Sequence, residues 1–380
     1  MRVVYFSKGF TTHDFNFLQK LSHSAHEVFF MRLEKDVHAD ENINLPHNIR
    51  IINWEGTNVK LVGTKDLWFV RQKLREQLDS LKPDILHAGP IYPCGLLAAL
   101  LGFKPLVVMS WGSDLLFDAD QSVYCNKVTK FVLRSASTIV VDSSAGQSKA
   151  LSMLGDQITH IVRFPWGVDL SIFRPRASQL SLRHNLGWYG NPIIISNRNW
   201  ERIYGVDTVL KGFALALKKA PETRLLLLGD GSIASHINQV IKDLHIEHVV
   251  CLTGRVPQHQ MAEYLSLADL YVSGSYKDGT SVSMLEAMAC GIPPIVTDLP
   301  VNQEWIIEGW NGWLYEAEDA VGLAKKIVAA VIDRTKLFAT GQAALSVVQQ
   351  RADWNNNFQK LLDSYELLRS KSDAWKEPRN

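Results

Sequence analysis

Residues 275–297, with the sequence SYKDGTSVSMLEAMACGIPPIVT, decide the fold and carry most of the chemistry. Asp278 and Glu286 bracket a Gly-Thr-Ser turn whose hydroxyls can cap a helix. The pattern predicts a helix over 282–290, closed by Gly291, and an apolar strand after the two prolines. A strand, a polar turn, a helix and a further strand in succession are typical of an α/β domain.

The turn at 279–281 suggests a ligand as well as a fold. The first turn of a helix has free N–H groups and a positive dipole end, so it attracts anions and hydroxyl oxygens. Ionised carboxylates on both sides suit a polyhydroxylated ligand, because each can accept hydrogen bonds from two hydroxyl groups. The combination suggests a sugar nucleotide. A capping box, with Ser283 as the cap and Glu286 as its return carboxylate, explains Glu286 equally well from local sequence.

Composition limits the class of protein. A chain of 380 residues, 46% hydrophobic and 21% charged, fits two globular domains of similar size. The net charge of +1 does not favour nucleic-acid binding. Four dispersed cysteines without a CxxC predict reduced thiols and no zinc site. We find no signal peptide and no apolar run of membrane-spanning length, so we expect a cytoplasmic protein, with a peripheral membrane contact left open.

Upstream, strands and helices alternate, which predicts mostly parallel sheets covered on both faces. The predicted strands are 3–6, 28–32, 49–53, 83–88, 106–110, 138–142 and 158–163, then 192–197, 223–228, 249–253 and 270–273. The predicted helices are 15–24, 65–81, 94–101, 206–219, 261–266, 323–331 and 354–368. The pattern breaks near 170–191, where glycines and prolines gather, so we place domains at 1–172 and 173–353.

A dinucleotide fingerprint competes with the sugar-nucleotide interpretation. Gly229-Asp230-Gly231-Ser232-Ile233-Ala234 fits G-x-G-x-x-A after a strand. That fingerprint also needs an acid at the end of the next strand, to hold the ribose. The next predicted strand ends without one, so the sequence argues against a nicotinamide or flavin site.

In order and spacing, the chain resembles the family-4 retaining glycosyltransferases, also called glycosyl transferases group 1. The resemblance rests on the Arg198 loop, LLLLGDGS, LTGRVP, ADLYVSGS, DGTSVSMLEAMACGIPPIVTD, NQEWI and NGWLY, and covers about residues 1–368. It implies the GT-B architecture: two facing Rossmann-like α/β domains, an interdomain cleft, and a C-terminal helix, about 354–372, crossing back to the N-terminal domain.

The resemblance also implies roles for residues of the second domain. Arg198 matches the basic residue on the donor diphosphate, Glu286 the ribose-binding carboxylate, and Asp278 the acid that contacts donor-sugar hydroxyls. The backbone at Gly279, Thr280, Ser281, Val282 and Ser283 would lie against the sugar and distal phosphate. Gly229 belongs to the same predicted donor site, and the Arg255-Val256 segment would hold the nucleobase.

In the first domain the resemblance is sparser. Gly9 matches a loop beside the diphosphate, and His13 is a polar candidate for catalysis, although His13-Asp14 also reads as a helix cap. The acceptor-side candidates are His13, His87, Trp111 and Asp114.

Three positions depart from the family pattern. Asp278 stands where the family usually has Glu, and Tyr204 stands before Gly205 where it usually has Lys. Arg202 is a candidate to replace that lost charge, with a plain surface arginine as the alternative. Trp111 occupies a position where relatives often have histidine, and an indole N–H donates a hydrogen bond but shuttles no proton.

The sequence therefore predicts a retaining, metal-independent glycosyltransferase of hexosyltransferase type, with no cofactor and a nucleotide-sugar donor, UDP-sugar being the commonest. The acceptor is a sugar, a lipid-linked sugar or a small molecule. A non-catalytic sugar-nucleotide-binding protein stays as the alternative, because of Trp111 and Tyr204, with a GT-B epimerase more distant. The oligomeric state is not predicted.

Overall fold

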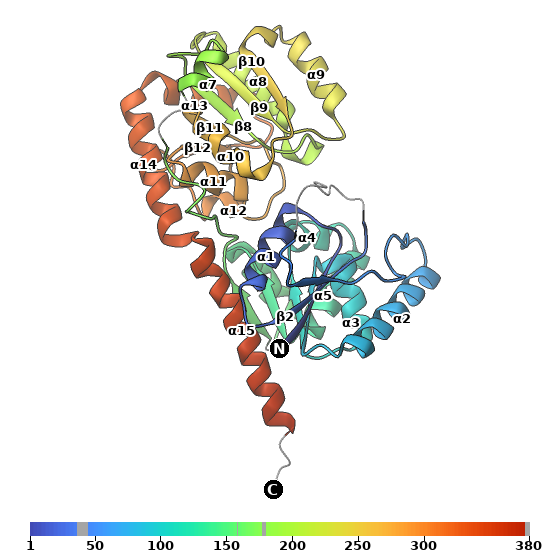
Figure 1. The fold of residues 1–380 in the computed structure, drawn as a ribbon. Coiled ribbons are helices and arrows are strands. Elements are labelled where there is room, and N and C mark those ends of the chain that lie inside the picture. The colour runs from blue at the N-terminus through green and yellow to red at the C-terminus, as the bar shows by residue number, and fades with distance from the viewer. Residues whose placement is uncertain (36–44, 158, 177–179, 377–380) are drawn as a thin grey trace. The chain divides into compact units, whose positions relative to one another are not determined.

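The computed structural model describes residues 1–35, 45–157, 159–176 and 180–376. The chain forms two compact units. The first contains Met1–Phe164 together with the last helix from Phe358 onward, and the second contains Pro165–Asn357. Each unit combines a parallel sheet with helices (Figure 1).

A parallel sheet forms the centre of the first unit. Its 7 strands run in the order β3-β2-β1-β4-β5-β6-β7. The strands are β1 (Arg2–Ser7), β2 (Glu27–Arg32), β3 (Ile49–Ile51), β4 (Ile85–Gly89), β5 (Leu106–Met109), β6 (Thr138–Val141) and β7 (His160–Arg163). The inner strands are mostly apolar, with His87 of β4 as a buried exception, because helices cover both faces.

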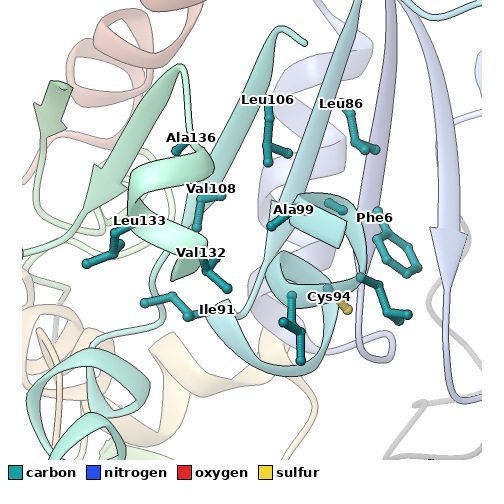
Figure 2. Packing of buried hydrophobic residues seen from close by; sticks show 14 of the residues in the cluster. Phe6, Leu86, Ile91, Cys94, Ala99, Leu106, Val108, Val132, Leu133 and Ala136 are labelled. Atoms are coloured by element: carbon teal, nitrogen blue, oxygen red, sulfur yellow. The ribbon is translucent and has the colours of Figure 1, made fainter. Parts of the chain in front are cut away.

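The helices of this unit pack in two layers (Figure 1). They are α1 (Thr12–Ser22), α2 (Thr64–Leu81), α3 (Leu96–Leu101), α4 (Ser113–Leu116), α5 (Val123–Ser135), α6 (Ser144–Leu154) and α15 (Trp354–Lys376), the last starting in the second unit. Side chains of α2, α3 and α5 pack with alternate strand residues such as Phe6 and Leu86 (Figure 2). The opposite side receives Phe17 of α1 and Phe358 of α15, whose ring centroids lie 5.6 Å apart.

The loop from β1 to α1 is held by a buried carboxylate. Thr11 is the N-cap of α1, and Asp14, which we expected as the cap itself, completes a capping box from inside the helix. The Thr11 backbone N–H donates to Asp14 Oδ2 at 2.8 Å, and the Tyr5 hydroxyl donates to Oδ1 at 3.2 Å. The helix therefore begins at Thr12, three residues before the predicted start.

The second unit repeats the architecture around a 6-stranded parallel sheet, in the order β10-β9-β8-β11-β12-β13. Its strands are β8 (Ile193–Ser196), β9 (Arg224–Leu228), β10 (Val250–Gly254), β11 (Leu270–Val272), β12 (Pro294–Thr297) and β13 (Trp313–Tyr315). Its helices are α7 (Leu180–Asn185), α8 (Val206–Leu217), α9 (Ala234–Asp243), α10 (Gln258–Leu265), α11 (Val282–Ala289), α12 (Pro300–Gln303), α13 (Ala320–Ile332) and α14 (Arg334–Arg351).

Two hydrophobic layers cover this second sheet. Ile193 and Ile195 of β8 pack with the layer that contains α10, α11 and α14. Ile194, between them, packs with the layer of α8, α9 and α13. Alternating residues of one strand enter opposite layers, as the two-residue period of a strand requires.

The α/β class, with two parallel sheets and helices, confirms the predicted fold class. No local pattern predicted helices α4, α5, α6, α7, α9, α12 and α14 or strand β13. It also began the helix at 94–101 too early, because a wider turn, Ile91–Gly95, precedes α3. The predicted strand at 158–163 includes residue 158, which lies outside the described residues.

Candidate functional site

The candidate site of the second unit lies where the strand order of its sheet reverses. β8, the first strand of the unit, is flanked by β9 on one side and β11 on the other. The connections leaving β8 and β11 therefore diverge at their carboxyl ends, which is where open α/β sheets bind ligands. Arg198 follows β8, and residues 273–281 follow β11, so the two predicted segments meet at this point.

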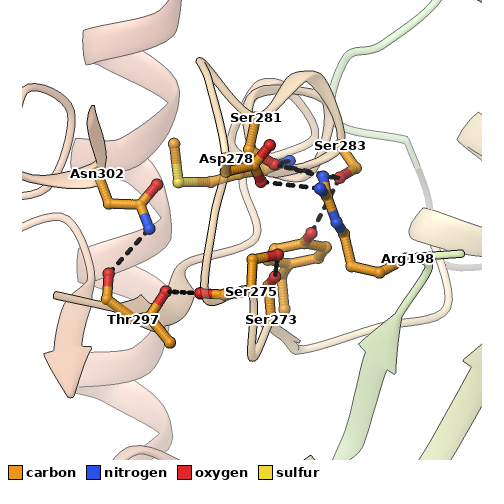
Figure 3. Close-up of polar contacts among 10 residues, drawn as sticks. Arg198, Ser273, Ser275, Asp278, Ser281, Ser283, Thr297 and Asn302 are labelled. Atoms are coloured by element: carbon orange, nitrogen blue, oxygen red, sulfur yellow. Dashed lines mark hydrogen bonds and ion pairs between the residues drawn. The ribbon is translucent and has the colours of Figure 1, made fainter. Parts of the chain in front are cut away.

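The Arg198 guanidinium is the centre of the contacts there (Figure 3). Its Nη2 lies 2.8 Å from Asp278 Oδ2, and its Nη1 donates to Ser281 Oγ at 3.0 Å and to Ser283 Oγ at 3.1 Å. The Tyr271 hydroxyl lies 3.0 Å from Ser283 Oγ. Arg198 thus joins the turn before α11 to the first turn of that helix.

The first turn of α11 differs from the capping box that local sequence allowed. Ser281 is the N-cap, and its hydroxyl accepts from the Met284 backbone N–H at 3.4 Å. Ser283 is inside the helix and faces Arg198, while Glu286 contacts another helix. The capping-box alternative for Ser283 and Glu286 was therefore wrong.

Glu286 is a buried carboxylate with an amide partner. Its side chain is 5% exposed, and the Gln258 side-chain amide donates to its Oε1 at 2.7 Å. Burial raises the pKa of Glu286 to about 7, and the Gln258 hydrogen bond opposes that shift. The sequence analysis missed Gln258; its place directly after Arg255-Val256-Pro257, a segment already singled out, was the available signal.

The largely buried ion pair of Arg198 and Asp278 fixes the charge of the site. Burial by itself lowers the pKa of Arg198, but Asp278, Tyr271 and Tyr204 beside it raise the pKa well above its ordinary value. Burial raises the pKa of Asp278, and Arg198 opposes that shift. The guanidinium is therefore a permanent cation, and Asp278 is its counter-ion.

Tyr204 lies against the face of the same guanidinium. The Arg198 Cζ atom is 4.2 Å from the centroid of the Tyr204 ring, within cation–π range. Arg202, two residues earlier in the short turn Arg202–Tyr204, is exposed. The structure thus gives Tyr204, and not Arg202, a contact with Arg198 among the contacts of the described residues.

Close packing of the Arg198 loop explains the glycines of the dinucleotide-like pattern. A Cβ on Gly229, where φ is +119°, would lie 2.6 Å from the Arg198 carbonyl oxygen. A Cβ on Gly231 would lie 2.4 Å from the Trp200 carbonyl oxygen. Both positions need glycine so that this loop can lie against them. Gly229 therefore supports the site through the backbone of Arg198.

The other second-unit candidates surround this centre. Gly279, Thr280 and Ser281 are buried, and Val282 is half-buried at the first position of α11. Val256 packs against the hydrophobic layer of α10 and α11, and Arg255, next to it, is exposed. Among the described residues, no cluster of His, Cys, Asp and Glu could hold a metal ion.

In the first unit, three of the candidates lie together: Trp111 and Asp114 follow β5, and His13 is in the first turn of α1, which follows β1. Asp114 accepts from the Trp111 backbone N–H at 2.9 Å, from the Ser110 hydroxyl at 2.6 Å and from the Ile91 N–H at 2.9 Å. Burial raises the pKa of Asp114 to about 6. The His13 ring lies edge-on to Trp111, with centroids 6.1 Å apart. Asp114 thus fixes the backbone of the Trp111 loop.

Gly9 and His87 lie elsewhere in that unit. Gly9 is in the connection between β1 and α1. His87 is 0% exposed in β4, and its Nδ1 lies 2.5 Å from the hydroxyl of Tyr365 in α15. Burial lowers the pKa of His87 to about 3, so the ring is neutral at physiological pH. In this structure His87 connects the sheet to the last helix and offers no surface to a ligand.

The helices that the structure describes include none with the length and apolar character needed to span a membrane.

Comparison with known proteins identifies two family models that match this chain. The model described as glycosyl transferases group 1 matches residues 181–361, which include the whole second-unit site. The model described as glycosyl transferase 4-like matches residues 2–143.

Individual relatives have low sequence identity to this chain, but the similarity extends over most of its length. N-acetyl-alpha-D-glucosaminyl L-malate synthase from Bacillus anthracis is 28% identical over 305 residues, 78% of this chain and 77% of that protein. The fold matches sucrose-phosphate synthase from Thermosynechococcus elongatus with a TM-score of 0.81 at 18% identity, over 97% of this chain and 99% of the other. It also matches Anabaena HepE in complex with UDP and glucose, with a TM-score of 0.79 at 18% identity, over 96% and 99%.

Proposed function

We infer the reaction from the premise that this chain belongs to the group 1 glycosyltransferases and has the GT-B fold. It is an enzyme of hexosyltransferase type. We propose that it transfers a sugar from a nucleoside diphosphate sugar to an acceptor hydroxyl, with retention of the anomeric configuration and without a metal ion.

One observation carries this proposal. Arg198, a permanent cation, contacts Asp278 and the first turn of α11, the helix that also carries Glu286, at the point where the strand order reverses. A cation and free helix N–H groups bind a diphosphate, and carboxylates bind the hydroxyls of two sugars. We therefore assign the diphosphate to Arg198, the ribose to Glu286 and the transferred sugar to Asp278.

The proposed step needs stabilisation of a leaving group. The acceptor oxygen forms a bond to the anomeric carbon while the bond from that carbon to the phosphate oxygen breaks. The bonding electron pair leaves on the diphosphate, which takes up the acceptor proton on the same face of the sugar. Arg198 and the amides at 279–283 would stabilise the developing charge, which is the work a metal ion does in other transferases.

The remaining candidates have subsidiary proposed roles. Arg255 and Val256 would hold the nucleobase, Gly229 would support the Arg198 loop, and Gly9 would approach the diphosphate. His13 and Trp111, in edge-on contact, are our candidates for the acceptor side, with Asp114 holding their loop. We propose UDP as the nucleotide because HepE, which shares the fold, was solved with UDP.

The experiment begins with thermal unfolding in a panel of nucleotide sugars. A ligand at 100 times its dissociation constant adds about 2.7 kcal/mol to the free energy of unfolding, a readily measured shift. Donor hydrolysis and transfer are then followed by NMR of the anomeric proton, with and without EDTA. If no nucleotide sugar in the panel raises the melting temperature, the proposed function is contradicted. An inverted product contradicts retention, and loss of activity in EDTA contradicts metal independence.

A further inference from the structure

Tyr204 is the one aromatic side chain recorded in contact with the Arg198 guanidinium face among the described residues, and the proposed function gives it no role. We propose that Tyr204 is a positioning residue, which holds Arg198 in place while the guanidinium exchanges its anionic partner from Asp278 to the diphosphate of the ligand. The inference rests on the proposed function and deepens it, since it explains how one cation serves two anions.

The first step concerns competition for Arg198. The cation already has a carboxylate at 2.8 Å, and the side chains of Arg198 and Asp278 are 11% and 16% exposed. A buried charge needs a partner, because leaving it unpaired is costly. A diphosphate that binds the Nη2 edge of Arg198 therefore takes over all or part of the position that Asp278 holds in this structure, while the Nε–H, which has no recorded partner, offers a second contact.

The second step concerns what stays fixed during that exchange. Hydrogen bonds of a guanidinium lie in its plane, and those recorded here use Nη1 and Nη2. Contact with the Tyr204 ring uses the face of the same group, at 4.2 Å from Cζ. Because the two directions are perpendicular, replacing Asp278 in the plane leaves the ring contact unchanged. Tyr204 is thus the partner that persists.

The third step concerns the rigidity of Tyr204 itself. It ends a single turn, in which its backbone N–H donates to the Glu201 carbonyl at 3.0 Å. Gly205 follows with φ of +55°, and a Cβ there would lie 2.1 Å from the Gly274 carbonyl oxygen. The Tyr276 N–H also donates to the Ile203 carbonyl at 2.8 Å. Contacts between the loops after β8 and β11 therefore hold this turn in place and fix the position of the Tyr204 ring.

Substitutions separate the ring from its hydroxyl. The contacts of the described residues include no hydrogen bond of the Tyr204 hydroxyl, so Tyr204→Phe keeps the proposed interaction, whereas Tyr204→Leu removes it. Tyr204→Met is a second variant of similar length without a ring. Tyr189→Leu is the matched control, since Tyr189 belongs to the same unit and is 71% exposed.

The test measures binding of UDP, GDP and ADP and of the corresponding nucleosides by calorimetry. For the tightest diphosphate, we expect Tyr204→Leu and Tyr204→Met to weaken binding about tenfold. We expect the matching nucleoside, which lacks the phosphates, to bind as it does to the wild type. Tyr204→Phe should stay within about twofold, as should Tyr189→Leu.

A double-mutant cycle with Arg198→Met makes the test specific. If Tyr204 acts through Arg198, then Tyr204→Leu has no further effect on diphosphate binding once Arg198 is replaced. Equal binding by the Phe and Leu variants, an equal loss for the nucleoside, or additive effects in the cycle would each overturn the inference. A wild type that binds no nucleoside diphosphate would instead contradict the proposed function.

Discussion

The Nη2 atom of Arg198 lies 2.8 Å from Oδ2 of Asp278, so the candidate site carries its own counter-ion. Resemblance to the family assigns these two residues to different parts of the donor. The structure adds that they are bound to each other, and every prediction about either residue has to include the other.

Replacing Arg198 should affect catalysis more than any other single change in the second unit. We expect Arg198→Ala to lower the transfer rate by about two orders of magnitude or more, as loss of one preorganised donor to a developing oxyanion does. Steady-state rates at saturating donor measure this directly. Lys242→Ala, which removes an exposed cation of α9, is the control. Near-normal turnover by Arg198→Ala would remove it from the mechanism.

Asp278→Asn should separate stability from anion binding. The change leaves the Arg198 charge without a carboxylate, which costs about 3–5 kcal/mol for a fully buried pair and less here, because both side chains keep some exposure. We therefore expect a lower melting temperature in buffer, together with a larger stabilisation by inorganic pyrophosphate than the wild type shows. An equal pyrophosphate response in the two proteins would mean that Asp278 does not compete for Arg198.

Donor binding should depend on pH through Glu286. Its pKa of about 7 lies above the ordinary 4.5, so the carboxyl of the free protein is largely protonated at pH 6 and ionised at pH 8. If ribose binds to the ionised form, the affinity for a nucleotide sugar should rise up to about tenfold over this range. A diphosphate diester keeps a constant charge there, so the ligand itself does not titrate.

The matched variant for that measurement is Glu286→Gln, which should bind weakly and show a flat pH profile. The same raised pKa has a consequence for stability. Below pH 4.5 the Glu286 carboxyl is protonated in both the folded and the unfolded protein, and its contribution to the free energy of unfolding is fully present. This contribution is lost as the pH rises through about 7. A wild-type affinity that does not change between pH 6 and 8 would contradict the role of the ionised form.

The contact of His87 with Tyr365 should matter for stability and not for the donor. Tyr365→Phe leaves a buried imidazole nitrogen without its partner, and we expect a loss of about 1–3 kcal/mol in the free energy of unfolding. Urea denaturation measures this loss, with the exposed Tyr189→Phe as the control. Affinity for nucleotide sugars should stay within about twofold.

Acid should also act through His87. Its pKa of about 3 lies below the ordinary 6.5, so the unfolded chain binds the proton first. Stability from this group is therefore lost as the pH falls below 6.5. His87→Phe should flatten that part of the stability profile, and a profile as steep as that of the wild type would show that other groups control it.

Much of the fold followed from local patterns. Apolar runs such as Ile193–Ser196 and Leu270–Val272 marked strands, because buried parallel strands leave few polar positions. Helix α14 was missed because Thr340, Gly341 and Gln342 interrupt its apolar pattern, although Thr340 and Gly341 are buried. Helix α9 was missed because Gly229 and Gly231 before it fit a ligand-binding fingerprint, and the residues that follow them were not assigned to a helix.

The site was predictable in its residues but not in their connections. Arg198, Asp278 and Glu286 each stood out from sequence, yet the capping-box alternative put the cap at Ser283, since either serine fits a cap and only the geometry selects Ser281. Contacts such as Gln258 with Glu286 depend on where separate helices meet, which no local pattern encodes. The assigned roles in the reaction stay predictions.

The division of the chain has a consequence for synthesis on the ribosome. The second unit is one continuous segment, Pro165–Asn357, whereas the first needs Phe358 and Tyr365 from the last helix to cover Phe17 and His87. Those two aromatic residues are translated after the whole second unit. The N-terminal sheet, although made first, therefore has one apolar face covered only in part, by residues such as Phe17 of α1, until the second unit has been translated. The first unit is thus completed after the second.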